Sequence, residues 1–172
     1  RRVRALHSAS FSFDASWEQL FWLLLGHELW LSNDDERRDA QMLTELVHAH
    51  QIDTLDVPPS LLAQMLDCGL MENPSHQPCQ ILIGSEAAPP ALWQQLQQYP
   101  ALQVTNFYGP TEYTVDAVSA SVPDSVLPVI GRPIANTEVY VLDASLNRVP
   151  VGVAGELYLS GSSMTIGYWQ QA

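Results

Sequence analysis

The sequence contains no lysine, and its seven basic residues are all arginine. Against them stand nineteen aspartates and glutamates, so the formal net charge at pH 7 is −12. A surface this acidic repels phosphate backbones and anionic lipid headgroups, which argues against nucleic-acid binding and against attachment to a membrane. The longest apolar run, residues 20–25, is far shorter than the roughly 20 residues that a membrane-spanning helix needs. We therefore expect a cytoplasmic protein.

Cysteine is scarce as well. Cys68 and Cys79 are too few for a disulfide framework and too far apart for a CxxC metal clip, so we expect two reduced thiols. The five histidines show no HExxH spacing, and no metal site is expected from them. The first residue is not methionine, no secretory signal follows it, and residues 168–172 carry no helix cap, so we expect a piece of a longer chain.

Strands and helices alternate through the first two thirds of the sequence, which predicts an α/β fold with a parallel sheet and flanking helices. Strands are predicted over residues 28–32, 54–57, 80–83 and 102–107. Helices are predicted from residue 17, where the helix is expected to be buried on most sides, and over 40–50, 60–66 and 92–98. Ser60 is expected to cap the third of these helices.

The helical signal ends at about residue 117. Short alternating strands at 139–142 and 156–159 are separated by proline and glycine turns, which is typical of a small antiparallel barrel or sheet lobe. We therefore expect an α/β lobe over residues 1–118 and a β-rich lobe over residues 119–172.

Ligands of open parallel sheets bind beyond the carboxyl ends of the strands, so the loops there are the candidate sites. The loop 106–112, Asn-Phe-Tyr-Gly-Pro-Thr-Glu, combines an aromatic ring, a tight turn, a hydroxyl and a carboxylate. Such a loop can stack on a base, bond a phosphate oxygen and hold a hard cation. An ordinary turn is the alternative, because Tyr-Gly-Pro is also favourable turn chemistry.

Three carboxylates stand out near predicted strand ends. Asp14 lies among aromatic residues and either binds a ligand or belongs to a helix cap, with Ser16 as the alternative capping residue. Asp56 and Asp116 follow or interrupt apolar strands, where a buried carboxylate is costly unless a cation or hydrogen-bond donors meet it. A turn cap ahead of Pro58 is the alternative for Asp56.

Several segments resemble, in the same order and spacing, the adenylation domains of nonribosomal peptide synthetases. The likeness covers essentially the whole chain, so the sequence resembles a core fragment of the large adenylation subdomain. It is carried by Phe-Asp-Ala-Ser at 13–16, by the loop 106–112, and by the segments 130–136, 139–143, 155–161 and 167–169.

The resemblance implies that the carboxylate of an amino acid attacks the α-phosphate of ATP, giving aminoacyl-AMP and pyrophosphate. The acyl group then passes to the phosphopantetheine thiol of a carrier-protein domain, and carrier-protein and condensation domains are the implied partners. Asp14 would hold the substrate α-ammonium, and Glu112 would ligate Mg²⁺. ATP or AMP would be bound by Gly84, Ser85, Asn106, Tyr108, Gly109 and Thr111, with Tyr108 stacked on adenine and with Thr111 and Glu112 as the catalytic pair.

The implied pocket for the amino-acid side chain is acidic. Its lining would consist of Ala15, Glu18 or Trp17, Asp56, Ile81, Ile83, Phe107, Val115 and Asp116. Glu18 and Trp17 are alternatives because the stretch 14–18 is one residue shorter than in many relatives. Carboxylates crowded in an apolar slot repel each other, so a cationic side chain is expected. Arginine leads because its planar fork can bond two carboxylates, ornithine or diaminobutyrate is second, and serine is the rival.

The sequence also departs from the family. It lacks the family's phosphate-binding loop and catalytic lysine, and Ser-Met-Thr-Ile at 163–166 replaces the usual Gly-hydrophobe-Ala-Arg. The chain alone is therefore expected to be inactive, while the parent would be an ATP-dependent ligase. Two alternatives are a carboxylate-CoA ligase of the same superfamily, which would not need Asp14, and a non-catalytic nucleotide or amino-acid binding module.

Overall fold

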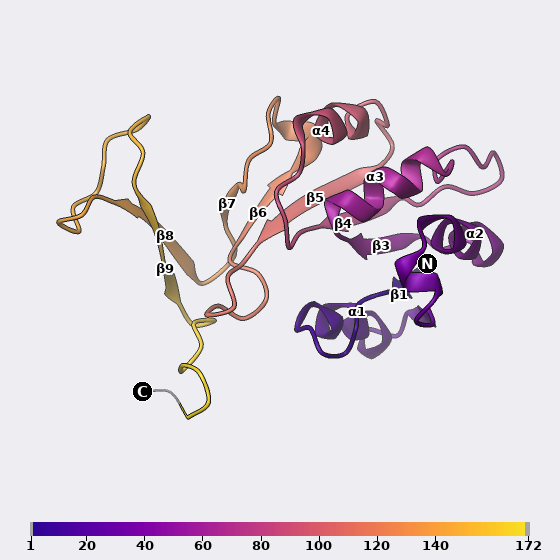
Figure 1. Ribbon diagram of the computed structural model, residues 1–172, viewed down its shortest axis with the longest axis horizontal. Helices are drawn as coiled ribbons and strands as arrows, with labels where there is room; N and C mark the ends of the chain where they lie inside the picture. Colours follow the sequence, from indigo (N-terminus) through magenta and orange to yellow (C-terminus); the bar gives the residue numbers. More distant parts are fainter. Residues whose placement is uncertain (1, 171–172) are drawn as a thin grey trace.

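The computed structural model describes residues 2–170 and contains a seven-stranded sheet in the order β2-β1-β3-β4-β5-β6-β7 (Figure 1). Strands β1 to β5 run parallel, and β6 and β7 are antiparallel to their neighbours. The strands are β1 (Arg4–His7), β2 (Glu28–Leu31), β3 (Thr54–Val57), β4 (Gln80–Ile83), β5 (Gln103–Tyr108), β6 (Val118–Ser121) and β7 (Arg132–Pro133). The predicted α/β class and parallel sheet are confirmed.

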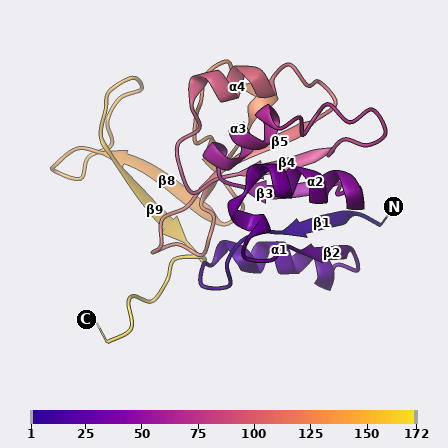
Figure 2. The same ribbon diagram turned by 45° about the vertical axis from the view of Figure 1, so that its right-hand side comes forward.

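The helices flank this sheet, and α1 lies on the other side of β1 from α2 (Figure 2). None of the helices within residues 2–170 is long and apolar enough to cross a membrane. They are α1 (Ala15–Leu24), η1 (Glu36–Arg38), α2 (Ala40–His50), α3 (Pro59–Asp67), α4 (Pro90–Leu96) and η2 (Val122–Asp124).

Local chemistry explains where these helices begin. The Asp39 carboxylate accepts hydrogen bonds from the backbone N–H groups of Gln41 and Met42, both at 2.9 Å, and so caps α2. Helices α3 and α4 begin at prolines, whose missing N–H is not needed in a first turn. The prediction that Ser60 caps α3 is wrong, because Ser60 lies inside the first turn and its N–H donates to the Glu86 carboxylate at 2.6 Å.

The core forms between the sheet and helices α2, α3 and α4. Its side chains include Leu43 and Val47 of α2, Leu62 of α3 and Trp93 of α4, all 0% exposed. The Trp93 indole N–H donates to the carbonyl oxygen of Ser125 at 2.8 Å, which satisfies the one polar atom of this buried ring. This packing holds the carboxyl ends of β3, β4 and β5 in fixed positions, and the candidate site lies at these ends.

The prediction that α1 is buried on most sides is wrong within the described residues. Only Ser16 and Gln19 of this helix are buried, while Trp17, Phe21 and Leu24 are 62%, 52% and 78% exposed. Apolar residues all around a helix favour burial. Within the described residues, however, the fully buried side chains of α1 are polar, and the apolar Leu20 and Trp22 are only half-buried.

The last two strands form a separate antiparallel ribbon, β8 (Thr137–Leu142) with β9 (Glu156–Gly161), which extends away from the main sheet (Figure 1). The buried Tyr113 connects the two, since its hydroxyl lies 2.7 Å from the hydroxyl of Thr137. The predicted small antiparallel part is confirmed, as a two-stranded sheet and not as a barrel. Strands β6 and β7 belong to the main sheet. The division into lobes at 118/119 stays a prediction.

The two cysteines are free, as expected, and both are exposed. The prediction that residues 168–172 carry no helix cap includes residues 171–172, which lie outside the described residues.

Candidate functional site

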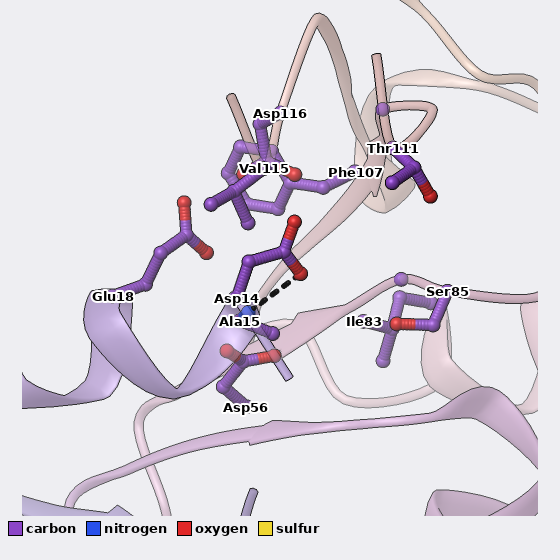
Figure 3. Close-up of a pocket in the computed structure, with 12 residues that line it drawn as sticks. Asp14, Ala15, Glu18, Asp56, Ile83, Ser85, Phe107, Thr111, Val115 and Asp116 are labelled. Atoms are coloured by element: carbon purple, nitrogen blue, oxygen red, sulfur yellow. Dashed lines mark hydrogen bonds between the residues drawn. The ribbon is translucent and has the colours of Figure 1, made fainter. Parts of the chain in front are cut away.

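A cavity of about 230 Å³ lies where the N-terminus of α1 faces the carboxyl ends of β3, β4 and β5 (Figure 3). Most of the residues that the sequence assigns to the substrate pocket are among those that line it. The lining residues are Asp14, Ala15, Glu18, Asp56, Ile83, Gly84, Ser85, Phe107, Gly109, Thr111, Val115 and Asp116.

Asp14 serves both of the roles that the sequence leaves open. Its carboxylate accepts a hydrogen bond from the backbone N–H of Ala15 at 2.9 Å, and it also lines the cavity (Figure 3). The alternative cap is not formed by Ser16, whose hydroxyl donates to the carbonyl oxygen of Phe13 at 2.7 Å. Asp14 therefore presents a negative charge at the opening of the cavity from a fixed position.

Three further carboxyl groups surround the cavity. Burial raises the pKa of Asp56 to about 7, and the charge of Glu18 adds to this rise, while a hydrogen bond from the Gln19 side chain acts in the opposite direction. Burial is also the main cause that raises the pKa of Glu18 and of Asp116. The nearby charges of Asp14 and Asp56 add to the rise for Asp116, and those of Asp116 and Asp14 add to the rise for Glu18, so the two carboxyl groups titrate as a pair.

The structure distinguishes between the sequence alternatives for this pocket. Glu18 lines the cavity, whereas Trp17 is not among the lining residues and is exposed. Asp56 lines the cavity too, and no side-chain hydrogen bond caps α3, which removes the reason to treat Asp56 as a turn cap. Ile81 is not among the lining residues. It is 0% exposed and lies two residues before Ile83 along β4, farther from the carboxyl end of the strand where the cavity lies.

Two lining residues have a left-handed backbone. Ser85 has φ 70° and Val115 has φ 56°, a conformation that is costly for a β-branched residue. The chain passes close to itself here, because a Cβ atom at Gly109 would lie 1.9 Å from the carbonyl oxygen of Val115. Only glycine fits at position 109, and strained backbone of this kind is concentrated at functional sites.

A second cavity, of about 390 Å³, opens beside the first and contains the expected adenine-binding residues Ser85, Asn106, Tyr108 and Gly109. Asn106 is 6% exposed, and its amide nitrogen donates to the carbonyl oxygen of Val129 at 2.9 Å. Its amide oxygen Oδ1 is buried and has no hydrogen-bond partner in the protein. A buried acceptor of this kind fits the exocyclic amine of an adenine base.

Thr111 and Glu112 follow this loop. Thr111 lines the first cavity, and the exposed Glu112 carboxylate accepts a hydrogen bond from the Tyr168 hydroxyl at 3.0 Å. No group of three or more histidine, cysteine or acidic side chains within residues 2–170 could hold a metal ion. Glu112 by itself still fits Mg²⁺, which proteins bind through one or two carboxylates together with substrate phosphates.

The divergent segment 163–166 lies directly beside these residues. Thr165 donates its N–H to the carbonyl oxygen of Glu112 at 2.9 Å, and the Thr114 hydroxyl donates to the carbonyl oxygen of Ser163 at 2.8 Å. The segment therefore supports the loop through its backbone, and these contacts do not depend on the side chains that differ from the family.

Two residues of the site were missed in the sequence. Leu82 points to the opposite face of β4 from Ile81 and lines a cavity that adjoins Glu18 and Asp116. Gln19 is 2% exposed, although it is polar, and bonds to both β3 and the segment after β1. A lone amide in an apolar helix was the available signal for Gln19.

The fold and site together define an α/β ligand-binding unit with an acidic cavity and an adjoining cavity suited to a nucleobase. The model of the AMP-binding enzyme family matches residues 1–169. The chain belongs to this family, as a segment of an adenylation domain of the nonribosomal peptide synthetase type.

Several relatives support this placement. The chain is 56% identical over 169 residues to vanchrobactin synthetase VabF of Vibrio anguillarum, covering 98% of this chain and 6% of the relative. It is 41% identical to tyrocidine synthase 3 of Brevibacillus parabrevis, covering 96% of this chain and 3% of the relative. This chain therefore spans only a small part of the length of these curated relatives.

Solved structures also support the placement of this chain among adenylation domains. A four-domain nonribosomal peptide synthetase, holo-AB3403 bound to AMP and glycine, is similar with a TM-score of 0.87 and 30% identity over 99% of this chain and 13% of that chain. Holo-PA1221, which contains adenylation and PCP domains, has a TM-score of 0.82 and 26% identity over 99% of this chain and 30% of that chain.

Proposed function

We propose that this chain forms the amino-acid and adenine pockets of a larger ATP-dependent synthetase, and that its substrate is a cationic amino acid, with arginine favoured. The observation that carries the proposal is the group of four carboxylates, Asp14, Glu18, Asp56 and Asp116, around one cavity of about 230 Å³. In such a site, a substrate with two positive charges supplies the charge balance that the protein itself lacks.

Asp14 is the residue proposed to bind the α-ammonium group. It lies on the rim of the cavity and also adjoins the loop that carries Gly84 and Ser85. A charge-assisted hydrogen bond from an ammonium to a carboxylate is about twice as strong as a neutral one, so this contact fixes the orientation of the substrate. The α-carboxylate then points away from Asp14, toward the nucleotide.

The nucleotide is proposed to occupy the neighbouring cavity. Asn106 Oδ1 accepts from the adenine amine, and Tyr108 offers a ring for stacking. Thr111 lines the wall between this region and the substrate cavity, where its hydroxyl can donate to an α-phosphate oxygen. Mg²⁺, held by Glu112 and the phosphates, would neutralise negative charge there.

The substrate side chain is proposed to reach Glu18, Asp56 and Asp116. Burial and mutual repulsion raise the pKa of all three groups, and a cation among them reverses that effect. A guanidinium has five N–H donors in a planar fork and can bond two carboxylates at once. The apolar residues Ile83 and Phe107 flank the space through which the stem of the side chain would pass.

Carrier-protein and condensation domains are the proposed partners of the parent enzyme, and the phosphopantetheine thiol is the proposed acceptor. The alternative of a carboxylate-CoA ligase is disfavoured by the placement of Asp14 on the cavity, because a substrate without an α-ammonium gives this carboxylate no counter-charge.

The test is amino-acid-dependent ATP–pyrophosphate exchange by the full-length synthetase, measured across the proteinogenic amino acids, ornithine and diaminobutyrate. We expect arginine, or another cationic amino acid, to give the highest kcat/KM. Preference for an aliphatic or acidic amino acid would refute the substrate class. A serine preference would retain a role for Asp116 and remove that of Asp56.

A further inference from the structure

The Gln19 side chain connects three parts of the fold that surround the substrate cavity. Its Oε1 atom accepts hydrogen bonds from the backbone N–H groups of Ser8 and Ala9, both at 3.0 Å. Its Nε2 atom donates to the carbonyl oxygen of Asp56 at 3.1 Å. Helix α1 is thereby tied to the segment that leaves β1 and to the end of β3. An amide this deeply buried is tolerated because these bonds satisfy it.

These bonds control the orientation of α1 about its own axis. Trp17, Phe21 and Leu24 are exposed, and Leu20 and Trp22 are half-buried, so no apolar side chain of α1 is fully buried within the described residues, whereas the Gln19 side chain is. Glu18 precedes Gln19 directly, and Ala15 lies one turn earlier on the same helix. A rotation of α1 that moves Gln19 would therefore move Glu18 relative to Asp56.

The Asp56 end of the connection is fixed in the same way. Its carbonyl oxygen accepts from Gln19 and also from the Ser8 hydroxyl, at 3.3 Å. Ser8 thus contacts both the Oε1 atom of Gln19, through its N–H, and the backbone of Asp56, through its hydroxyl. The result is a closed set of hydrogen bonds among Ser8, the backbone of Asp56 and Gln19, which is next in the chain to Glu18.

We propose that Gln19 is a positioning residue, whose amide sets the spacing between the Glu18 and Asp56 carboxylates that a cationic substrate side chain bridges. The inference rests on the function proposed above. An amide is suited to this place because it accepts and donates at once. An ionised glutamate would instead face the carbonyl oxygen of Asp56 with a second acceptor and would add a charge to an already acidic site.

The test compares Gln19→Met and Gln19→Glu with Gln64→Met in the full-length synthetase. Gln64 lies on the exposed side of α3, where its amide donates only to the carbonyl oxygen of Ser60 at 3.2 Å, so it is the matched control. We expect both Gln19 variants to raise the KM for arginine at least tenfold and to leave the KM for ATP within about twofold. Gln64→Met leaves both constants unchanged.

Amide hydrogen exchange provides a readout that does not depend on activity. The amides of Ser8 and Ala9 are expected to exchange faster in Gln19→Met, while in Gln19→Glu these two acceptor bonds persist. Should Gln19→Met fail to fold, Gln19→Glu decides through the two KM values. A fall in kcat with an unchanged KM for arginine, or an equal rise in both KM values, means a purely structural role and overturns the proposal.

The two proposals fail in different ways. If the unmodified enzyme activates a non-cationic amino acid, the substrate class is wrong, and the positioning role is judged on the KM for that amino acid. If it activates none, the proposed function fails, and calorimetric titration with arginine is compared between the unmodified and Gln19→Met proteins. Equal affinity, or no binding by either, then overturns the positioning role.

Discussion

The KM for arginine should fall as the pH rises from 6 to 8. Asp56 has a pKa of about 7 in the empty site, so it is largely protonated at pH 6 and largely ionised at pH 8. A guanidinium binds the ionised form, and binding of the cation must therefore displace the proton. The rise in pKa that burial causes thus becomes a pH dependence of substrate affinity.

The size of the change in KM follows from the titration of one group, Asp56. For a single group with a pKa of about 7, protonation weakens binding by a factor of about 11 at pH 6 and about 1.1 at pH 8, so KM changes about tenfold over this interval. The pair Glu18 and Asp116, which titrates together, adds to the slope in the same direction.

The assay is pyrophosphate exchange by the full-length synthetase at saturating ATP, with arginine varied at each pH. The Asp56→Asn variant is the control, since its amide does not titrate and its curve of KM against pH should be flatter. A KM for arginine that is constant between pH 6 and 8 would refute the reasoning, and so would an Asp56→Asn variant that keeps the full slope.

Three further outcomes are expected. Asp14→Ala should raise the KM for the amino acid about tenfold or more, because loss of a charge-assisted hydrogen bond costs roughly 1.5–3 kcal/mol. Asp14→Glu should keep the melting temperature near that of the unmodified enzyme. An unchanged KM in Asp14→Ala would leave Asp14 with its capping bond alone. Glu112→Gln should retain amino-acid binding and require more Mg²⁺ for turnover, since an amide is a weaker ligand for a hard dication; equal Mg²⁺ titrations of the two forms would place the ion elsewhere. Asp56→Asn should stabilise the substrate-free enzyme by about 4 kcal/mol at pH 8 but by less than about 1 kcal/mol at pH 4. The folded-state pKa of Asp56 is raised from 3.8 to about 7, so the folded protein holds a proton that the unfolded chain loses, and stability falls as the pH rises across this range; melting curves at both pH values that shift equally would contradict this.

The elements that the sequence predicts well are those with strong local signals. The strands 54–57 and 80–83 and the helix 40–50 are found at the predicted positions, because apolar periodicity, the Asp39 cap and flanking prolines all act locally. The acidic pocket is also foreseeable, since the loops after parallel strands converge at one edge of a sheet.

What the sequence does not reveal depends on neighbours in space. The exposure of α1 could not be predicted, because its composition indicates only that the helix favours burial and not whether another surface covers it. The place of β6 and β7 in the main sheet was missed for a similar reason, since strand pairing between distant segments leaves no local pattern. Ile81 and Ile83 differ only in their position along β4. Which of the two side chains lines the cavity can be decided only from the packed structure.

The loop that carries Thr111 and Glu112 is joined to two different sheets. On one side it continues from β5 of the main sheet, and on the other the hydroxyls of Tyr113 and Thr137 connect it to the ribbon β8–β9. At its centre, Thr165 bonds to the carbonyl oxygen of Glu112. The loop therefore connects the main sheet to the ribbon, and the backbone of Glu112, whose carboxylate is proposed to hold the metal, is bonded to the segment that follows the ribbon.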